Sequence, residues 1–191
     1  MSFGITANLT PATGFPVENG IPLALVSGSW TCQKSGRYLV IITGGGSGST
    51  YQEPGTGGAT MLFFVSLFAG NVYDYIIGAG GTAAPWPASA GGESYFGHLA
   101  ANGGGKRSHQ AGGWLTNNFP SQGSGLGYSG GSSPGGAGSY PNNVGPTLPL
   151  QGGGSVYGIG GIGAVPDADA HGAGGGIDFA GANGAIELWM S

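Results

Sequence analysis

Glycine constrains this chain more than any other residue, because it supplies 46 of the 191 residues and gathers in tracts. Average proteins contain about 7% glycine. Glycine loses more backbone entropy on folding than other residues, and one in a helix interior costs about 1 kcal/mol relative to alanine. A fold built on α-helices is therefore excluded. Collagen is excluded as well, because the glycines follow no strict triplet.

The rest of the composition is that of a folded chain with few charges. Hydrophobic residues make up 39% and charged residues 6%, with a formal net charge of −4. A disordered chain needs low hydrophobicity and high charge, and a nucleic-acid-binding domain needs a basic excess, so both classes are excluded. The single cysteine, Cys32, cannot form an internal disulfide and fits a small apolar strand residue. The longest apolar run, 61–69, is too short to cross a bilayer, so no membrane insertion is expected.

Runs of β-branched and aromatic residues predict the strands. These runs are 21–27, 36–43, 59–69, 72–77, 94–96, 98–101 and 184–190. Gly70-Asn71 predicts a hairpin turn between the third and fourth of them. No segment repeats with a period of about 3.6 residues, so we expect an all-β fold with little or no helix. The aromatic residues expected in the core are Trp30, Tyr38, Phe63, Phe68, Tyr75 and Trp189.

Glycine tracts separate these runs, and they have two interpretations. The tracts are 44–49, 55–58, 78–81, 90–92, 102–105, 111–113, 123–131, 135–138, 152–163 and 172–176. Glycine-rich chains can be flexible linkers. The tracts alternate with strands, however, and apolar residues recur to the end of the chain, which favours a packed bundle of extended threefold helices. Polyproline-II geometry leaves the backbone free to bond between helices, and glycine lets backbones approach closely.

The order of the segments resembles a known family. The quoted stretches are GRYLVIITGGGSGS, GGATMLFFVSLFAGNVYDYIIGAGG, GGESYFG and AGANGAIELWM. Together they resemble the glycine-rich domain at the tips of bacteriophage tail fibres, over nearly the whole chain from residue 21. The resemblance implies a polyglycine-II sandwich, with about ten glycine helices beside a small antiparallel sheet region. It also implies that loops joining the helices bind the bacterial surface. Residues 1–20 are expected as an arm or attachment segment, and 21–191 as one domain.

The direction of the tracts predicts which loops bind. If tracts alternately leave the strands and return, 44–49 leaves, 55–58 returns, and 172–176 returns to the final strand. Five loops then lie at the far end: 50–54, 82–89, 106–110, 132–134 and 164–171. Polar, charged and aromatic residues on rigidly held loops are typical of a binding tip. The candidate receptor-binding residues are Tyr51, Gln52, Glu53, Trp86, Lys106, Arg107, His109, Asp167, Asp169 and His171.

Some of these candidates have a second interpretation. Trp86 lies between two prolines, which hold its backbone extended, and it is either an exposed anchor or a cover over the bundle. Lys106-Arg107 is either a solvated pair or a receptor contact. Asp167, Asp169 and His171 alternate, which places them on one face of an extended segment. A metal site is one interpretation, but solvated acids fit better, so we expect no metal.

Two motifs resemble enzyme motifs but lack their context. Residues 76–83 imitate a dinucleotide-binding fingerprint, which needs a helix N-terminus after it, whereas Pro85-Trp86-Pro87 follows. Residues 127–131 match GxSxG, which needs a strand, a turn and a helix. Neither a Walker lysine nor a zinc-ligand set occurs. We therefore expect no enzyme activity and no cofactor.

The function expected is that of a phage tail-fibre adhesin. Its partners would be an outer-membrane protein or surface polysaccharide of the bacterium and the remainder of the fibre. The first 20 residues have neither the basic nor the apolar region of a secretory signal, so we expect synthesis in the host cytoplasm and a place in the virion. Whether the tip is a monomeric cap or a homotrimer stays open. The alternative function is a structural, assembly or ice-binding-like module.

Overall fold

The computed structural model describes residues 9–49, 55–83, 89–105, 124–128 (backbone only), 171–175 and 179–191. These residues contain strands but no helix, and every strand pair among them is antiparallel. The all-β expectation is confirmed for this part of the chain.

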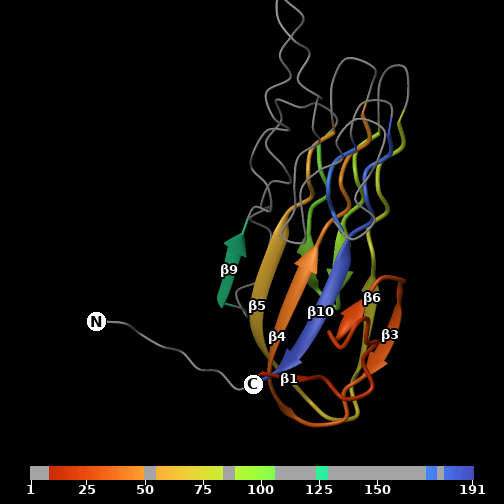
Figure 1. The fold of residues 1–191 in the computed structure, drawn as a ribbon. Coiled ribbons are helices and arrows are strands. Elements are labelled where there is room, and N and C mark those ends of the chain that lie inside the picture. Colours follow the sequence, from red (N-terminus) through yellow and green to blue (C-terminus); the bar gives the residue numbers. More distant parts are fainter. Residues whose placement is uncertain (1–8, 50–54, 84–88, 106–123, 129–170, 176–178) are drawn as a thin grey trace, which may run out of the picture.

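The strands form two sheets (Figure 1). The six-stranded sheet runs in the order β1 (Thr10–Pro11), β10 (Ala185–Met190), β4 (Gly36–Thr43), β5 (Thr60–Leu67) and β9 (Ser124–Tyr128), and β2 (Leu23–Ala24) also pairs with β10. The four-stranded sheet runs in the order β3 (Gly28–Thr31), β6 (Val72–Ile76), β7 (Ser94–Phe96) and β8 (Leu99–Ala101). Residues 9–20, expected as part of an arm, supply β1 and pack Phe15 into the core.

The hydrophobic core lies between the two sheets. Alternate residues of β4 and β5 face it, such as Tyr38, Val40 and Phe63. Trp30 of β3 packs its ring against four other aromatic rings, with centroids 5.8 Å from Tyr38 and 6.1 Å from Tyr73. The predicted core positions Trp30, Tyr38, Phe63 and Tyr75 are confirmed as buried.

Two expectations about the strands are wrong, and two residues expected in the core, Phe68 and Trp189, are less buried than expected. The strands β5 and β6 do not form a hairpin, because β5 belongs to the six-stranded sheet and β6 to the four-stranded one. Each covers the core with one face, so the chain crosses between sheets at residues 68–71, where Gly70 has φ +84°. Phe68 therefore lies on this crossing and is 59% exposed. Trp189 is half-buried. Residues 124–128, expected in a glycine tract, form the strand β9 beside β5.

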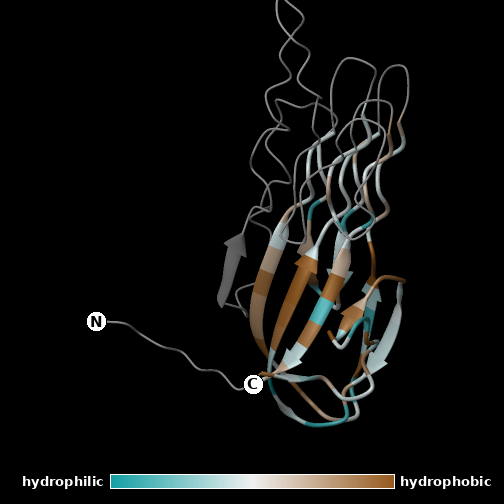
Figure 2. Ribbon diagram, viewed as in Figure 1, coloured by the Kyte–Doolittle hydropathy of each residue, from teal (hydrophilic) through white to brown (hydrophobic). Residues whose placement is uncertain are grey.

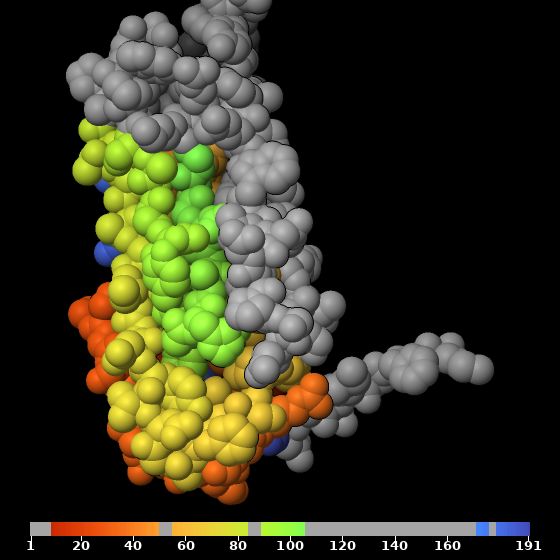
Figure 3. Space-filling model, turned by 180° about the vertical axis from the view of Figure 1, so that it is seen from behind, coloured from red at the N-terminus to blue at the C-terminus, as the bar shows by residue number. Residues whose placement is uncertain are grey.

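Six strands of both sheets continue into glycine-rich segments at one end of the sandwich (Figures 1 and 2). Segments 44–49, 78–82 and 102–105 follow β4, β6 and β8, while segments 55–59, 89–93 and 179–184 lead into β5, β7 and β10. A seventh segment, 171–175, lies among them. We call these seven the glycine array, and 44–49 its central segment. In Figure 3 the green atoms, from the part of the chain near residue 100, form a column along the long axis of the molecule.

Hydrogen bonds from the central segment go to three neighbours in turn. The N–H groups of Gly44 and Ser47 donate to segment 55–59, at Ala59 and Thr56. Those of residues 45 and 48 donate to segment 89–93, and those of residues 46 and 49 to segment 179–184. The donor–acceptor distances are 2.9–3.1 Å. N–H groups that are three residues apart in the central segment thus donate to the same neighbouring segment.

The carbonyl groups of the central segment bind the other three neighbours. Gly45, Gly46 and Ser47 accept from Gly104, Gly81 and Gly175 respectively. The central segment is therefore hydrogen-bonded to all six other segments. The glycines of the central segment leave no room for a side chain: a Cβ on Gly46 would lie 1.9 Å from the carbonyl oxygen of Ala173.

The last two segments run differently from the expectation. The N–H groups of Gly58 and Gly55 donate to the carbonyls of Gly172 and Gly175, so 171–175 is antiparallel to 55–59. Because 55–59 runs toward the sheets, 171–175 runs away from them, and 179–184 is the returning segment. The expected return of 172–176 is wrong. Segment 179–184 was missed because it contains alanines, with glycine only at 181 and 184. Tracts 111–113, 135–138 and 152–163 lie outside the described residues.

Candidate binding site at the far end of the glycine array

The far end of the array gathers residues that flank several of the predicted binding loops. Ser49 and Gly55 flank 50–54, Ala83 and Ser89 flank 84–88, and Gly105 precedes 106–123. Hydrogen bonds connect these flanks across the array: Gly48 donates to Ser89, and Gly55 donates to Gly175. The topology therefore anchors these loops to one scaffold.

Hydroxyl groups hold the flanking residues together. The Ser49 hydroxyl donates to the Phe179 carbonyl (3.0 Å) and accepts from the Phe179 N–H (2.9 Å). The Thr56 hydroxyl donates to the Gly105 carbonyl at 3.0 Å. The Thr82 N–H donates to the Ser89 hydroxyl at 2.6 Å. Serine and threonine side chains near the ends of these segments thus add hydrogen bonds to the backbone of neighbouring residues.

Nine of the ten candidate receptor-binding residues lie outside the described residues. They are Tyr51, Gln52, Glu53, Trp86, Lys106, Arg107, His109, Asp167 and Asp169. The tenth, His171, is at the sheet end of the array, because the neighbouring Gly172 bonds to Asn183 and Gly58, close to the starts of β10 and β5. The expectation that His171 lies at the far end is wrong, because residues 171–175 run away from the sheets and so begin at the sheet end.

The described residues do not bring metal ligands together. No group of three histidine, cysteine or acidic side chains lies close enough to hold a metal ion in the described ranges. Within the same ranges, no helix is long and apolar enough to cross a membrane.

The segment that imitates a dinucleotide fingerprint uses its N–H groups within the protein. Gly78 donates to the Ser94 hydroxyl, Gly80 to the Asn183 side chain and Gly81 to the Gly46 carbonyl, at 2.8–2.9 Å. A pyrophosphate needs such N–H groups free to point at it. In this segment they stabilise the array instead.

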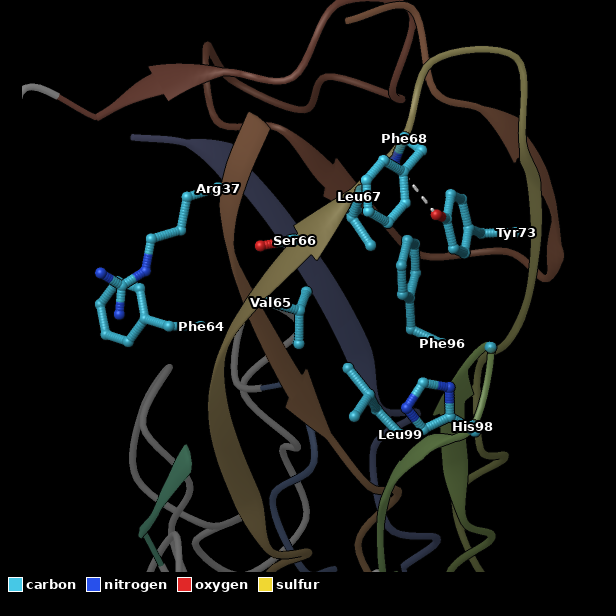
Figure 4. Close-up of a pocket in the computed structure, with 11 residues that line it drawn as sticks. Arg37, Phe64, Val65, Ser66, Leu67, Phe68, Tyr73, Phe96, His98 and Leu99 are labelled. Atoms are coloured by element: carbon cyan, nitrogen blue, oxygen red, sulfur yellow. Dashed lines mark hydrogen bonds between the residues drawn. The ribbon is translucent and has the colours of Figure 1, made fainter. Parts of the chain in front are cut away.

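A cavity of about 640 Å³ lies at the side of the sandwich, away from the far end. Figure 4 shows Arg37 beside the Phe64 ring on one side of β5, with Leu67, Phe96 and Leu99 on the other side. The Arg37 guanidinium is 5.2 Å from the Phe64 ring centre, a cation–π contact. Because its described lining shares no residue with the far end, the cavity is separate from the candidate site.

Titratable groups with shifted pKa values lie in the sandwich rather than in the described part of the far end. Burial, together with a hydrogen bond to Cys32, raises the pKa of Tyr38 to about 12. Burial also raises the pKa of Tyr75. The pKa of Tyr95 is raised because its hydroxyl donates to the Glu93 carboxylate. These shifts concern the stability of the sandwich.

Comparisons with known proteins give no relative: no protein-family model matches the chain, and no curated protein is detectably similar in sequence.

Proposed function

We propose that this chain is a receptor-binding domain at the tip of a phage tail fibre, and that its glycine segments are polyglycine-II helices. It acts without catalysis: the helices present loops to an outer-membrane protein or a surface polysaccharide of the bacterium. The rest of the fibre is its second partner, and the virion is its place of action.

The period of three in the hydrogen bonds of the central segment carries this proposal. A β-strand bonds to two neighbours, because its backbone groups point alternately to opposite sides. The N–H groups of residues 44–49 instead visit three neighbours in rotation. A helix with three residues per turn and no internal hydrogen bonds has this property. Polyglycine-II packing of this kind is what the resemblance to tail-fibre tips implies.

Rigidity is the second support for the proposal. Loops that are ordered before binding lose less entropy when they meet a receptor. The far-end segments are cross-linked by backbone bonds and by the hydroxyls of Ser49, Thr56 and Ser89. Loops anchored there start from fixed points, and several fibres on one virion then multiply weak contacts.

The proposal is tested by binding of the purified, fluorescently tagged protein to a panel of bacteria. Protease-treated cells and polysaccharide-deficient strains are measured alongside. Strain-selective binding is expected, and the treatment that abolishes it identifies the receptor class. A folded protein that binds no strain would overturn the proposal in favour of a structural or assembly module.

Within that assay, Trp86→Ala is expected to weaken binding about tenfold or more, because buried aromatic anchors dominate many interfaces. Its circular dichroism and thermal unfolding should match the wild type. Val26→Ala, a change at a side chain 77% exposed on the sandwich, is the matched control and should bind normally. Unchanged binding of the Trp86 variant would exclude that loop from the site.

A further inference from the structure

The cavity at the side of the sandwich, which we call the side cavity, lies between the end of β5 and the hairpin of β7 and β8. Residues 64–68 line it from both faces of β5, and residues 96–99 line it from the hairpin (Figure 4). Its volume is about 640 Å³. Sites for small molecules occupy about 300–1,000 Å³, so the side cavity has the size of such a site.

One wall of the side cavity is apolar and already packed. The rings of Tyr73 and Phe96 are stacked, with centroids 5.6 Å apart and an interplanar angle of 12°. Leu67 and Leu99, in the same wall, are buried. The Tyr73 hydroxyl accepts a hydrogen bond from the Phe68 N–H at 3.3 Å, which connects Phe68 to this wall. A ligand would therefore meet a preformed surface, and little entropy would be lost in ordering it.

Phe68 leaves apolar surface in contact with water at the side cavity. Its side chain lines the cavity and is 59% exposed. An apolar group that enters the cavity covers part of the Phe68 ring and gains the free energy of removing that surface from water.

Arg37 supplies a positive charge on the other side of the cavity. Its guanidinium group lies 5.2 Å from the centre of the Phe64 ring and makes no hydrogen bond or ion pair with a described residue. The cation–π contact holds the guanidinium group in place. Its N–H donors match the two oxygens of a carboxylate, so they can bind an acidic group of a ligand.

The side cavity is basic although the protein is acidic. Its described lining contains Arg37 and His98 but no aspartate or glutamate, whereas the whole chain has eight acidic residues and four lysines or arginines. His98 lies in the turn between β7 and β8, where Gly97 has φ +58°. A cleft lined by charge of one sign attracts ligands of the opposite sign, so the side cavity favours an anion.

We propose that the side cavity is a binding site for a small amphipathic anion, a molecule with one carboxylate or sulfonate group and an apolar ring or chain. The acidic group binds Arg37, and the apolar part lies against Phe68 and Tyr73. All residues of this site belong to the sandwich, so the inference does not depend on the proposed receptor binding.

The first experiment titrates the purified protein with anilinonaphthalene sulfonate, an anionic dye that reports binding to apolar surface. Arg37→Gln should weaken dye binding about tenfold, because charge-assisted hydrogen bonds are lost. Lys34→Gln is the matched control: it removes the same charge from an exposed side chain outside the described lining and should bind within about twofold of the wild type. No dye binding by the folded wild type, wild-type binding by Arg37→Gln, or an equal loss in Lys34→Gln would overturn the inference.

The apolar part of the site is tested by Phe68→Ala, which should weaken dye binding about fivefold. Because Phe68 is largely exposed, thermal unfolding of the variant should stay close to that of the wild type. Val72→Ala is the control, since Val72 is 61% exposed and lies outside the described lining. Dye binding by Phe68→Ala that equals that of the Val72→Ala control would count against the proposed site.

A competition experiment on the unchanged protein identifies the class of ligand. Octanoate and naphthoate, one acid with a chain and one with a ring, should displace the dye, and the tighter of the two shows which apolar part fits. Octanol and octylamine carry the same chain without a negative charge and should bind at least about tenfold more weakly than octanoate. Failure of both acids to displace the dye, or equal displacement by octanol, would also overturn the inference.

Discussion

Glycine is needed in the array because it has no Cβ atom. At Gly46 a Cβ would lie 1.9 Å from a carbonyl oxygen and 2.3 Å from its carbon, both in the backbone of Ala173. Backbone cannot rotate aside as a flexible side chain does, so a methyl group here must push two segments apart.

Gly46→Ala is therefore expected to lower the free energy of unfolding by at least about 2–3 kcal/mol. Gly36→Ala is the control, because the nearest atom to its Cβ would be a Tyr38 ring carbon at an ordinary 4.0 Å. Urea unfolding of the three proteins measures the difference. Equal stability of the two variants would contradict close packing in the array.

Tyr38 is a single residue that makes the free energy of unfolding depend on pH. Its side chain is 1% exposed, and its pKa is about 12 in the fold, against about 10 in an unfolded chain. The folded state therefore keeps the proton of the Tyr38 hydroxyl up to a higher pH than the unfolded state does. The stabilisation is complete below about pH 10 and is lost as the pH rises through about 12, by up to about 3 kcal/mol.

Urea unfolding at several values between pH 9 and pH 12 should show this fall. The buried Tyr75, whose pKa is also raised, contributes in the same direction. Tyr38→Phe should be less stable at pH 8, because the hydroxyl bonds to the Lys34 carbonyl at 2.7 Å. Its loss of stability between pH 10 and pH 12 should be smaller, and a slope equal to that of the wild type would refute the assignment.

Among the elements, strands were easier to predict than glycine segments. A strand such as β4 buries its side chains, so its sequence is a run of apolar and β-branched residues that can be recognised. A glycine segment bonds through its backbone, which every residue has, so the sequence does not indicate its neighbours. Segment 179–184 was missed because alanines separate its glycines, and the error reversed the expected direction of 172–176. Gly181 and Gly184, three residues apart, were the available signal: at both, a Cβ would approach a backbone carbonyl oxygen within 2.2 Å.

Ser94 joins the array to both sheets. Its buried hydroxyl accepts from the Gly78 N–H at 2.9 Å and donates to the Thr43 carbonyl at 2.7 Å. Ser94→Ala leaves the Gly78 N–H buried without this acceptor, and we expect a loss of about 1–3 kcal/mol in the free energy of unfolding. Thermal unfolding measures it, with the exposed Ser66→Ala as control. A Ser94 variant as stable as the control would show that the junction is held elsewhere.

At the scale of the molecule, the sandwich and the array share their chain connections and one continuous hydrogen-bond network in the described residues. The central segment is fully buried and its six N–H groups all donate to backbone carbonyls. We expect the amides of 44–49 to exchange hydrogen only through global unfolding, at the rates of the β4 amides. Residue-resolved hydrogen exchange measures this. Faster exchange of the whole segment would mean that the array opens separately from the sandwich.

The overall architecture was partly accessible from the sequence. The all-β class follows from composition and from the runs that became β4, β5 and β10. The far-end flanks of 50–54 and 84–88 agree with the expected direction of the first four segments. His171 fell at the opposite end because one unrecognised segment changes the direction of its neighbour in the chain. The position of a loop in such a molecule depends on every segment before and after it.

The central segment has a consequence for how such a protein changes over generations. At its four glycines, 44, 45, 46 and 48, a Cβ would lie within 2.3 Å of a backbone carbonyl oxygen, so we expect most substitutions there to prevent folding. Exposed positions near segment ends, such as Thr82 and Ala90, already carry side chains and have no such restriction. Tolerated substitutions are therefore expected to accumulate at exposed positions. The surface of the protein can then change during evolution while the glycine array keeps its structure.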